Sequence, residues 1–388
     1  MRVFAVAAGL SVATLLGAGA ARAYPQTIAK GYTNCVTCHY NPNGGGLANS
    51  YGHATLEATF PNTVKLDWLQ AMRDKAAKRD VLGWQESDGQ EGARQAVFHW
   101  DVGAESRWLL MTASDAANGD TSVLFVPMML EAGGAVAYGP LTAYATLTVR
   151  RAGADYFSTL QPFSREHWLQ WRMGDGLSLR AGRMVLPFGI RTPDHTLYNR
   201  EDFGFDKHAG SYGLQFDHNS ATTNVSVMAF AGDPLLQPAR AQERGLAASA
   251  AVDLVSRASI GISWLGGVSE LTARTAGALF ARVRIVHRVY AMGELTAQLK
   301  SSLTAVASQT NYAATLRIGW FVLESLDLYG ETAWRGAAGA PELQKARYVL
   351  GVNWQALPWI ELAPALVAEE SYEHGMRLTG MLQLHLMY

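Results

Sequence analysis

The sequence lacks the features that mark several common classes of protein. Beyond its first 23 residues it has no apolar run near the roughly 18 residues that a membrane-spanning helix requires. It has no basic stripe, and its formal net charge is −1, which argues against nucleic acid as a partner. Catalytic triads, phosphate-binding loops and paired-carboxylate motifs are also missing, so we expect no hydrolytic or transferase chemistry.

The N-terminus has the pattern of an export signal. A basic residue precedes an apolar run over residues 3–20, which ends in the small-x-small cleavage pattern Ala21-Arg22-Ala23. We therefore predict a signal peptide over residues 1–23. An uncleaved anchor helix is the alternative, but the run is barely long enough to span a bilayer.

Cysteine is scarce, since only Cys35 and Cys38 occur. Their spacing in an exported chain allows a tight disulfide, half of a zinc site or a haem attachment. His39 follows at once and completes C-x-x-C-H, in which two thiols bond to the haem vinyl groups and the imidazole binds the iron. A zinc site would need two further close Cys or His ligands, and a redox disulfide would need a thioredoxin-like context; neither is visible. We predict one covalent haem c on Cys35 and Cys38, with His39 as the proximal iron ligand.

The residues after this motif suit a flat cofactor. The glycines at 44–46 permit close backbone approach, although a flexible loop has the same composition. His53 is the first candidate for the sixth iron ligand, Met72 is the second, and an open site is the third. Residues 61–80 have the pattern of a short amphipathic helix, so the haem-binding segment spans residues 24–80. Residues 81–93 resemble a linker.

From about residue 94 onward the sequence alternates with a period of two. Segments of about ten residues, such as 141–150, 279–288, 312–322 and 326–335, carry charges on one face and apolar side chains on the other. This pattern is typical of a barrel with a polar lumen and a lipid-facing apolar band. The strands of a soluble sandwich also alternate. A soluble sandwich protein of this length would be divided into domains, however, and no linker divides residues 94–388. We predict an all-β fold, a transmembrane antiparallel β-barrel of about 16 strands, within a range of about 14–18.

Two short features agree with an outer-membrane barrel. The last strand alternates up to a terminal aromatic, Tyr388, and residues 182–189 resemble the G-R-x-x-x-P-F-G strand end of many porins. In a porin-like barrel the loop that follows, about 190–209, folds inward and narrows the pore; the alternative is a solvated surface loop. Its acids and histidines could bind Fe(II) weakly: Asp194, His195, Glu201, Asp202, Asp206 and His208.

The signal peptide, the monohaem motif and the barrel together resemble the fused cytochrome–porin family, which includes outer-membrane iron oxidases. The matching residues are Cys35, Cys38 and His39 within residues 34–46. The barrel region matches only in its alternating pattern, without a sequence motif. The resemblance implies a bacterial outer-membrane protein in contact with lipid, with its haem in the lumen or on the periplasmic side. Electrons would pass between an extracellular donor, such as Fe(II), and a periplasmic carrier, such as a soluble cytochrome. Four arginines would hold the haem propionates or line a wet pore: Arg282, Arg284, Arg288 and Arg317.

Three functions remain open from the sequence. The first is electron transfer across the outer membrane, which would make the chain an oxidoreductase if Fe(II) is its substrate. The second is a passive or redox-gated porin whose haem segment is regulatory or structural. The third is a barrel subunit that docks a separate cytochrome, in which case C-x-x-C-H is accidental and no covalent haem forms.

Overall fold

A computed structural model gives the fold. It describes residues 28–29, 38–41, 47, 49, 52, 98–114, 121–151, 160–174, 176–192, 197–205, 210–233, 242–255, 257–305, 307–357, 360–372 and 375–387. The predicted signal peptide, the helix at 61–80 and the linker at 81–93 lie outside this part of the chain, so those predictions stay predictions. No helix of the described part is long and apolar enough to cross a membrane.

Strands make up almost all of the described chain. The strands are β1 (Phe98–Ser114), β2 (Thr121–Tyr138), β3 (Leu141–Arg151), β4 (Leu160–Phe163), β5 (His167–Gly174), β6 (Leu177–Val185), β7 (Gly210–Asn219), β8 (Thr223–Phe230), β9 (Arg244–Val255), β10 (Ala258–Val268), β11 (Thr272–Val286), β12 (Val289–Ser302), β13 (Ser308–Leu323), β14 (Leu326–Ala337), β15 (Ala340–Leu357), β16 (Ile360–Ser371) and β17 (Gly375–Met387). A short helix, α5 (Tyr198–Glu201), lies between β6 and β7.

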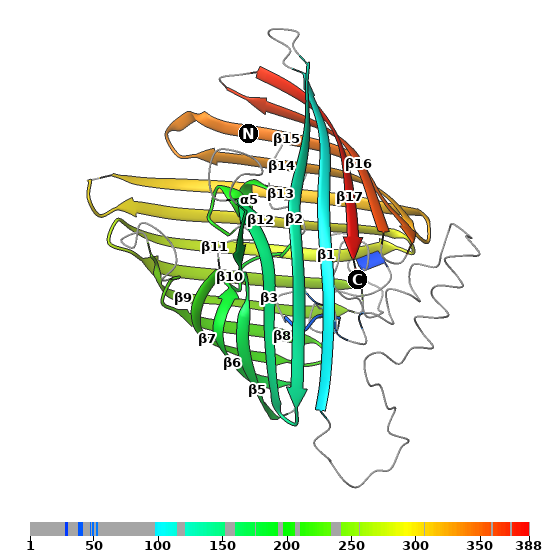
Figure 1. The fold of residues 1–388 in the computed structure, drawn as a ribbon. Helices are drawn as coiled ribbons and strands as arrows, with labels where there is room; N and C mark the ends of the chain where they lie inside the picture. Colours follow the sequence, from blue (N-terminus) through cyan, green and yellow to red (C-terminus); the bar gives the residue numbers. More distant parts are fainter. Residues whose placement is uncertain are drawn as a thin grey trace, which may run out of the picture.

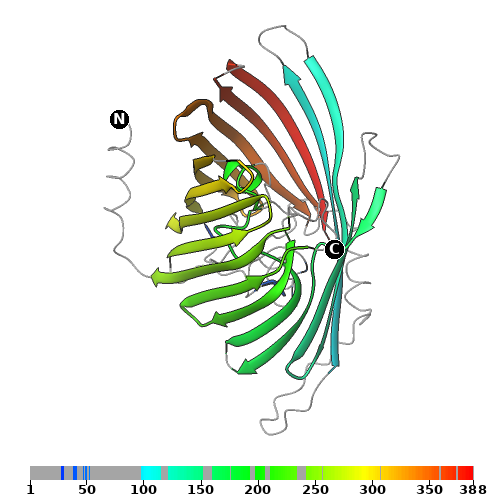
Figure 2. The same ribbon diagram turned by 90° about the vertical axis from the view of Figure 1, so that its left-hand side faces the viewer.

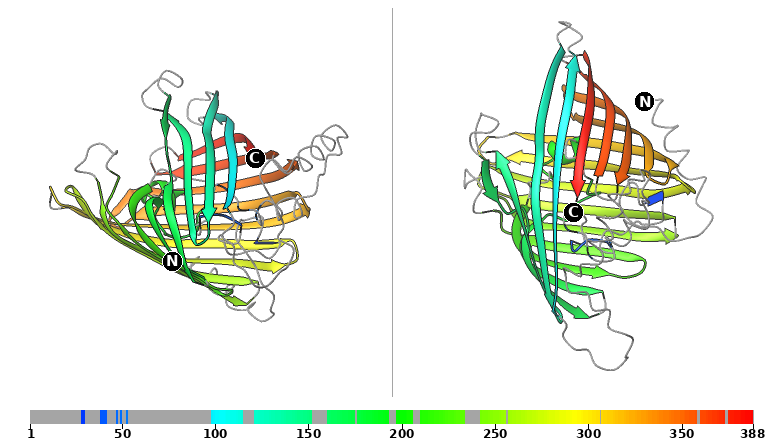
Figure 3. Two further views of the ribbon diagram at one scale, coloured as in Figure 1. Left: turned by 60° about the horizontal axis from the view of Figure 1, so that its bottom comes forward. Right: turned by 45° about the vertical axis from the view of Figure 1, so that its right-hand side comes forward.

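The strands form one antiparallel sheet that closes on itself. Successive strands pair along the chain, and the barrel is closed where β1 pairs with β17, from Glu105↔Met387 to Ser114↔Leu378. β4 and β5 both pair with β3 and follow one another along it, so together they form one strand of the barrel wall. The barrel therefore has 16 strands. Figure 1 shows β1–β3 crossing in front of the rear strands, and the right-hand view of Figure 3 shows β17 beside β1. The predicted antiparallel barrel of about 16 strands is confirmed.

The junction of β4 and β5 is a β-bulge. Between the pairs Thr148↔Phe163 and Ala145↔His167, β3 advances by three residues while the opposite strand advances by four. A bulge bends its strand and re-aims side chains. Here it allows the neighbouring residues Arg165 and Glu166 both to be buried, with 6% and 1% of their surfaces exposed.

The two faces of the wall differ as the alternation predicts. On β13, Leu316, Ile318 and Trp320 are exposed on the outer face, whereas Arg317 between them is buried on the lumen side. An apolar outer face and a polar inner face are what a lipid-facing barrel requires. One sequence expectation is wrong: Arg288 is not a lumen residue. It lies in the turn between β11 and β12 with φ 77°, and its ion pair is exposed.

The two ends of the barrel carry very different connections. At the end where β1 begins, tight turns join the strands, such as Gly139-Pro140 between β2 and β3, where Gly139 has φ 56°. A positive φ favours glycine, because it has no Cβ to clash with the backbone. The opposite end carries the long links 186–209 and 231–243. The described residues of the first link, 186–192 and 197–205, enter the barrel, and α5 lies between the strands of the wall in Figures 1 and 2.

Candidate functional site in the barrel lumen

The link after β6 folds into the lumen, and we call its described residues, 186–192 and 197–205, the constriction loop. Phe188 and Phe205 stack with ring centroids 3.9 Å apart, which joins the two halves of the loop. Leu197 and Phe203 are also buried, in the core cluster that includes wall residues. Burial of these apolar side chains stabilises the inward conformation. The sequence interpretation of an inward-folding loop therefore describes the structure, and the surface-loop alternative does not.

The first half of the constriction loop is held by Glu294 of β12. The Glu294 carboxylate accepts hydrogen bonds from the backbone N–H of Ile190 at 2.6 Å and from Arg200 Nη2 at 2.7 Å. Burial lowers the pKa of the Arg200 guanidinium, and the negative charge of Glu294 opposes that effect. Gly189 has φ 59°, and a Cβ at this position would lie 2.5 Å from the Glu294 carboxylate oxygens. The loop therefore approaches this carboxylate closely because residue 189 is glycine.

The second half of the loop is held by neighbouring strands of the same wall. Arg274 of β11 donates from Nη1 to the backbone carbonyl of Phe203 at 2.5 Å, and Asp202 forms an ion pair with Arg335 of β14. Burial and the carboxylate of Glu369 raise the pKa of the Tyr198 phenol, so Tyr198 stays neutral. The loop therefore spans the lumen from β6 to the wall formed by β10–β14.

The weak Fe(II) site suggested for this loop gains no support. Of its six suggested residues, Asp202 is paired with Arg335 and Glu201 is the last residue of α5. The other four, Asp194, His195, Asp206 and His208, lie outside the described residues. Among the described residues, no group of three or more His, Cys, Asp or Glu side chains is arranged to hold a metal ion.

A second piece of chain also lies inside the barrel. We call the described residues 28–29, 38–41, 47, 49 and 52 the N-terminal segment. Ile28 and Ala29 are 1% and 3% exposed and pack in a cluster with Ile190 of the constriction loop and Phe321 of β13. Leu47 packs in a different cluster, which includes Tyr144 of β3. The N-terminal segment therefore contacts two parts of the lumen wall.

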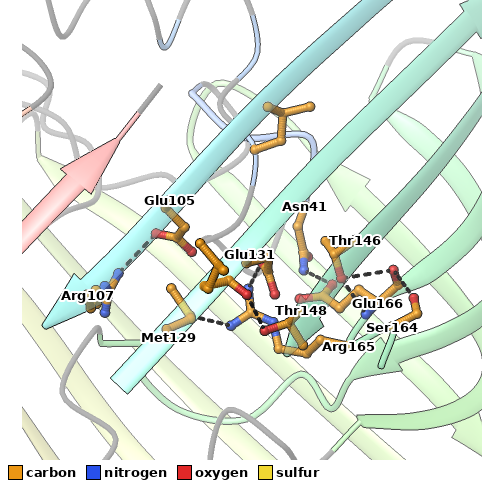
Figure 4. Close-up of polar contacts among 12 residues, drawn as sticks. Asn41, Glu105, Arg107, Met129, Glu131, Thr146, Thr148, Ser164, Arg165 and Glu166 are labelled. Carbon is orange, nitrogen blue, oxygen red and sulfur yellow. Dashed lines mark hydrogen bonds and ion pairs between the residues drawn. The ribbon is translucent and has the colours of Figure 1, made fainter. Parts of the chain in front are cut away.

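Polar contacts fix the N-terminal segment to the wall. Tyr40 donates its hydroxyl to Asp101 of β1, and the Asn41 side chain donates from Nδ2 to Glu166 at 2.5 Å. Figure 4 shows Asn41 reaching Glu166 beside Thr146. Burial and the Asp101 carboxylate raise the pKa of the Tyr40 phenol, so the phenol remains a donor. Leu47 adds a backbone N–H bond to the Tyr144 hydroxyl at 3.3 Å. These contacts hold the segment against β1, β3 and the bulge.

The wall behind these contacts is itself paired. Arg180 of β6 and Asp217 of β7 form a fully buried ion pair at 2.9 Å. The Arg180 guanidinium also lies 5.2 Å from the centre of the Trp168 ring and donates to the Asn41 Oδ1 at 3.3 Å. Trp168 in turn stacks on Tyr144 with centroids 4.8 Å apart. Because the charges of Arg180 and Asp217 are paired and the Trp168 ring packs between Arg180 and Tyr144, the surface that receives the N-terminal segment is preorganised.

The haem motif is partly within the described chain. Cys38 and His39 directly precede Tyr40, and both are half-buried. A partly accessible thiol can form a thioether bond to a haem vinyl group, and the adjacent imidazole can bind its iron, so the residues present fit that group. Cys35, His53 and Met72 lie outside the described residues. The attachment and the sixth ligand remain predictions.

Two of the arginines suggested as partners of the haem propionates already contact other side chains of the barrel. Arg317 pairs with Glu331 at 3.3 Å and stacks over Tyr329 at 3.7 Å. Arg282 lies over the Phe280 ring at 5.4 Å. Sequence reasoning named these arginines but missed the residues that hold the N-terminal segment, chiefly Glu166. Alternation could have placed Asp101, Arg180 and Glu166 in the lumen, but no sequence signal marks the bulge that buries Arg165 beside Glu166.

The comparisons with known proteins bear on the fold alone. No protein-family model matches the chain, and no curated protein sequence matches it either. Solved structures do match. The anion-selective porin from Comamonas acidovorans has a TM-score of 0.60 at 12% identity, covering 75% of this chain and 100% of the porin. The outer membrane channel DcaP of Acinetobacter baumannii has a TM-score of 0.54 at 13% identity, covering 77% of this chain and 99% of the channel. A loop-deletion mutant of OmpT from Vibrio cholerae has a TM-score of 0.58 at 9% identity, covering 75% of this chain and 99% of the mutant. The chain therefore has a porin-like barrel fold.

Proposed function

We propose that this protein is a bacterial outer-membrane barrel of the porin type, whose pore is narrowed by the constriction loop and the N-terminal segment. The observation that supports it is the closed barrel itself, with an apolar outer face and a charged lumen. Barrels of this kind place their short turns in the periplasm and their longer loops outside. Both ends of the barrel, at β1 and β17, then lie on the periplasmic side, and the constriction loop enters from the outside.

Conductance tests this function directly. The purified full chain is reconstituted into planar lipid bilayers, and single-channel currents are recorded. A water-filled lumen gives discrete conductance steps, smaller than those of an unobstructed barrel because two segments share the lumen. A protein that inserts but gives no steps, also after removal of the N-terminal residues, would show that the lumen is sealed and is not a pore.

The second candidate function is electron transfer through one covalent haem c. It is favoured by the position of Cys38 and His39, which the N-terminal segment carries inside the barrel. In this proposal Cys35 and Cys38 hold the haem by thioether bonds, and His39 binds its iron. The group supplies one-electron redox chemistry. The role of the chain is to hold the motif within the lumen through Tyr40 and Asn41, between an extracellular donor such as Fe(II) and a periplasmic carrier such as a soluble cytochrome.

Haem staining separates the two candidates. Outer membranes are run on a denaturing gel and stained for haem peroxidase activity, comparing the wild type with Cys35→Ala/Cys38→Ala. A stained band of the mature size that is lost in the variant supports the second candidate, and stopped-flow reduction by Fe(II) then tests the donor. If the wild type does not stain but still conducts, only the porin candidate is supported.

A further inference from the structure

Glu166 is the point at which the two lumen segments meet. Its Oε2 accepts the hydrogen bond from Asn41 of the N-terminal segment at 2.5 Å, and its Oε1 accepts one from Arg191 of the constriction loop at 2.8 Å. The backbone of Glu166 is fixed to β3, because Thr146 N–H donates to the Glu166 carbonyl at 2.8 Å and Thr146 Oγ1 accepts from its N–H at 3.1 Å. One carboxylate on a rigid wall therefore holds both segments.

We propose that Glu166 couples docking of the N-terminal segment to the position of the constriction loop, so that release of either segment loosens the other. One consequence rests on the proposed pore: undocking of the N-terminal segment widens the lumen. The coupling itself follows from the shared carboxylate.

Desolvation supplies the physical mechanism. The Glu166 side chain is 1% exposed and that of Arg191 is 19% exposed, and the Glu166 carboxylate raises the pKa of Arg191 despite the opposing effect of burial. An ion pair shielded from water is far stronger than the same pair in contact with it. When Asn41 leaves, water reaches Glu166 and competes for Arg191. Linkage makes the effect reciprocal, so loss of Arg191 weakens the docking of Asn41 by the same factor.

Local hydrogen exchange measures this coupling without any need for conductance. The reporter amides of the N-terminal segment are Tyr40, Leu47 and Asn49, whose N–H groups are hydrogen-bonded. Those of the constriction loop are Gly189 and Ile190, which bond to Ser263 and Glu294. Each reporter set lies in a peptide of its own, so exchange can be assigned to one segment.

Two single variants each remove one donor and leave Glu166 in place. In Asn41→Leu, we expect the loop reporters to exchange about tenfold faster, and in Arg191→Gln the segment reporters to accelerate by about the same factor. The double variant should exchange no faster than the faster single variant, because the coupling is already lost. Arg274→Gln is the matched control, since Arg274 holds the loop at Phe203 and is not bonded to the N-terminal segment. It should loosen the loop only near 202–205, leave the Arg191–Glu166 pair intact and so leave the segment reporters unchanged.

The outcomes are decisive in both directions. If Asn41→Leu accelerates only the segment reporters and Arg191→Gln only the loop reporters, the two segments are independent and the proposal is overturned. Reciprocal acceleration supports it even if the barrel passes no current, so failure of the pore and failure of the coupling are told apart. Where the barrel does conduct, Asn41→Leu should also raise the mean single-channel current. An unchanged current would overturn the consequence that undocking of the N-terminal segment widens the lumen.

Discussion

Replacing Glu294 with glutamine tests whether the constriction loop sets the size of the pore. The wild-type carboxylate accepts three hydrogen bonds, from the Ile190 N–H, from Arg200 Nη2 and from Thr296 Oγ1, at 2.6, 2.7 and 2.9 Å. Glutamine keeps the shape of the side chain but loses its charge, so the Arg200 guanidinium, whose side chain is 6% exposed, is left without its counter-charge.

The expected magnitude follows from the burial of this ion pair. Breaking a buried pair by removing one partner costs about 3–5 kcal/mol. Arg200 also donates to the carbonyls of Phe188 and Ile190, which favours the lower end. A cost of about 3 kcal/mol changes the ratio of docked to undocked loop by a factor of about 150. We therefore expect larger and noisier single-channel currents, and a lower midpoint for thermal unfolding, read from the heat-dependent gel mobility of the barrel.

Glu324→Gln is the matched control for this experiment. Its ion pair with Arg288 is exposed, with 39% and 43% of the two side chains accessible, so its loss should cost about 0–1 kcal/mol and leave the currents unchanged. Currents from Glu294→Gln that equal those of the wild type and of this control would refute the conclusion that Glu294 holds the loop in the pore.

Three further substitutions probe the wall and the loop. Arg180→Met leaves Asp217 buried without its counter-charge and should destabilise the barrel by about 3–5 kcal/mol, seen as a lower midpoint of gel mobility; a normal midpoint would mean that water reaches this pair. Gly189→Val places a Cβ against the Glu294 carboxylate at a positive φ, so the currents should rise as they do in Glu294→Gln, and wild-type currents would argue against this close contact. Leu316→Arg puts a charge on the outer face at a site that is 45% exposed. It should cost about 2–4 kcal/mol if that site lies near the bilayer midplane, and refolding into lipid vesicles that matches the wild type would place it elsewhere.

The barrel was predictable because its signal is local. Outward side chains such as Leu316 and Ile318 alternate with lumen residues such as Arg317, and a strand shows this alternation whatever its partner is. The strand count followed from the same pattern, whereas the sequence left two interpretations open for the loop after residues 182–189, an inward fold and a solvated surface loop. Alternation misplaced Arg288, because it cannot show where a strand turns. The candidate haem motif is also local, so the sequence alone names its residues, and its attachment stays a prediction.

The lumen site was decided by the tertiary structure. Asn41 and Glu166 are 125 residues apart in the sequence and meet only because the barrel closes around the N-terminal segment. Glu166 lies on the same face of its strand as Trp168, in the register of β5, and the extra residue at the β4–β5 bulge brings Arg165 to that face as well. One residue of register leaves no trace in the composition of a strand. The sequence by itself determined a barrel with a polar lumen and a candidate haem motif near its N-terminus. Only the folded chain determined which lumen residues hold that segment and the constriction loop, because those contacts depend on register and closure rather than on local pattern.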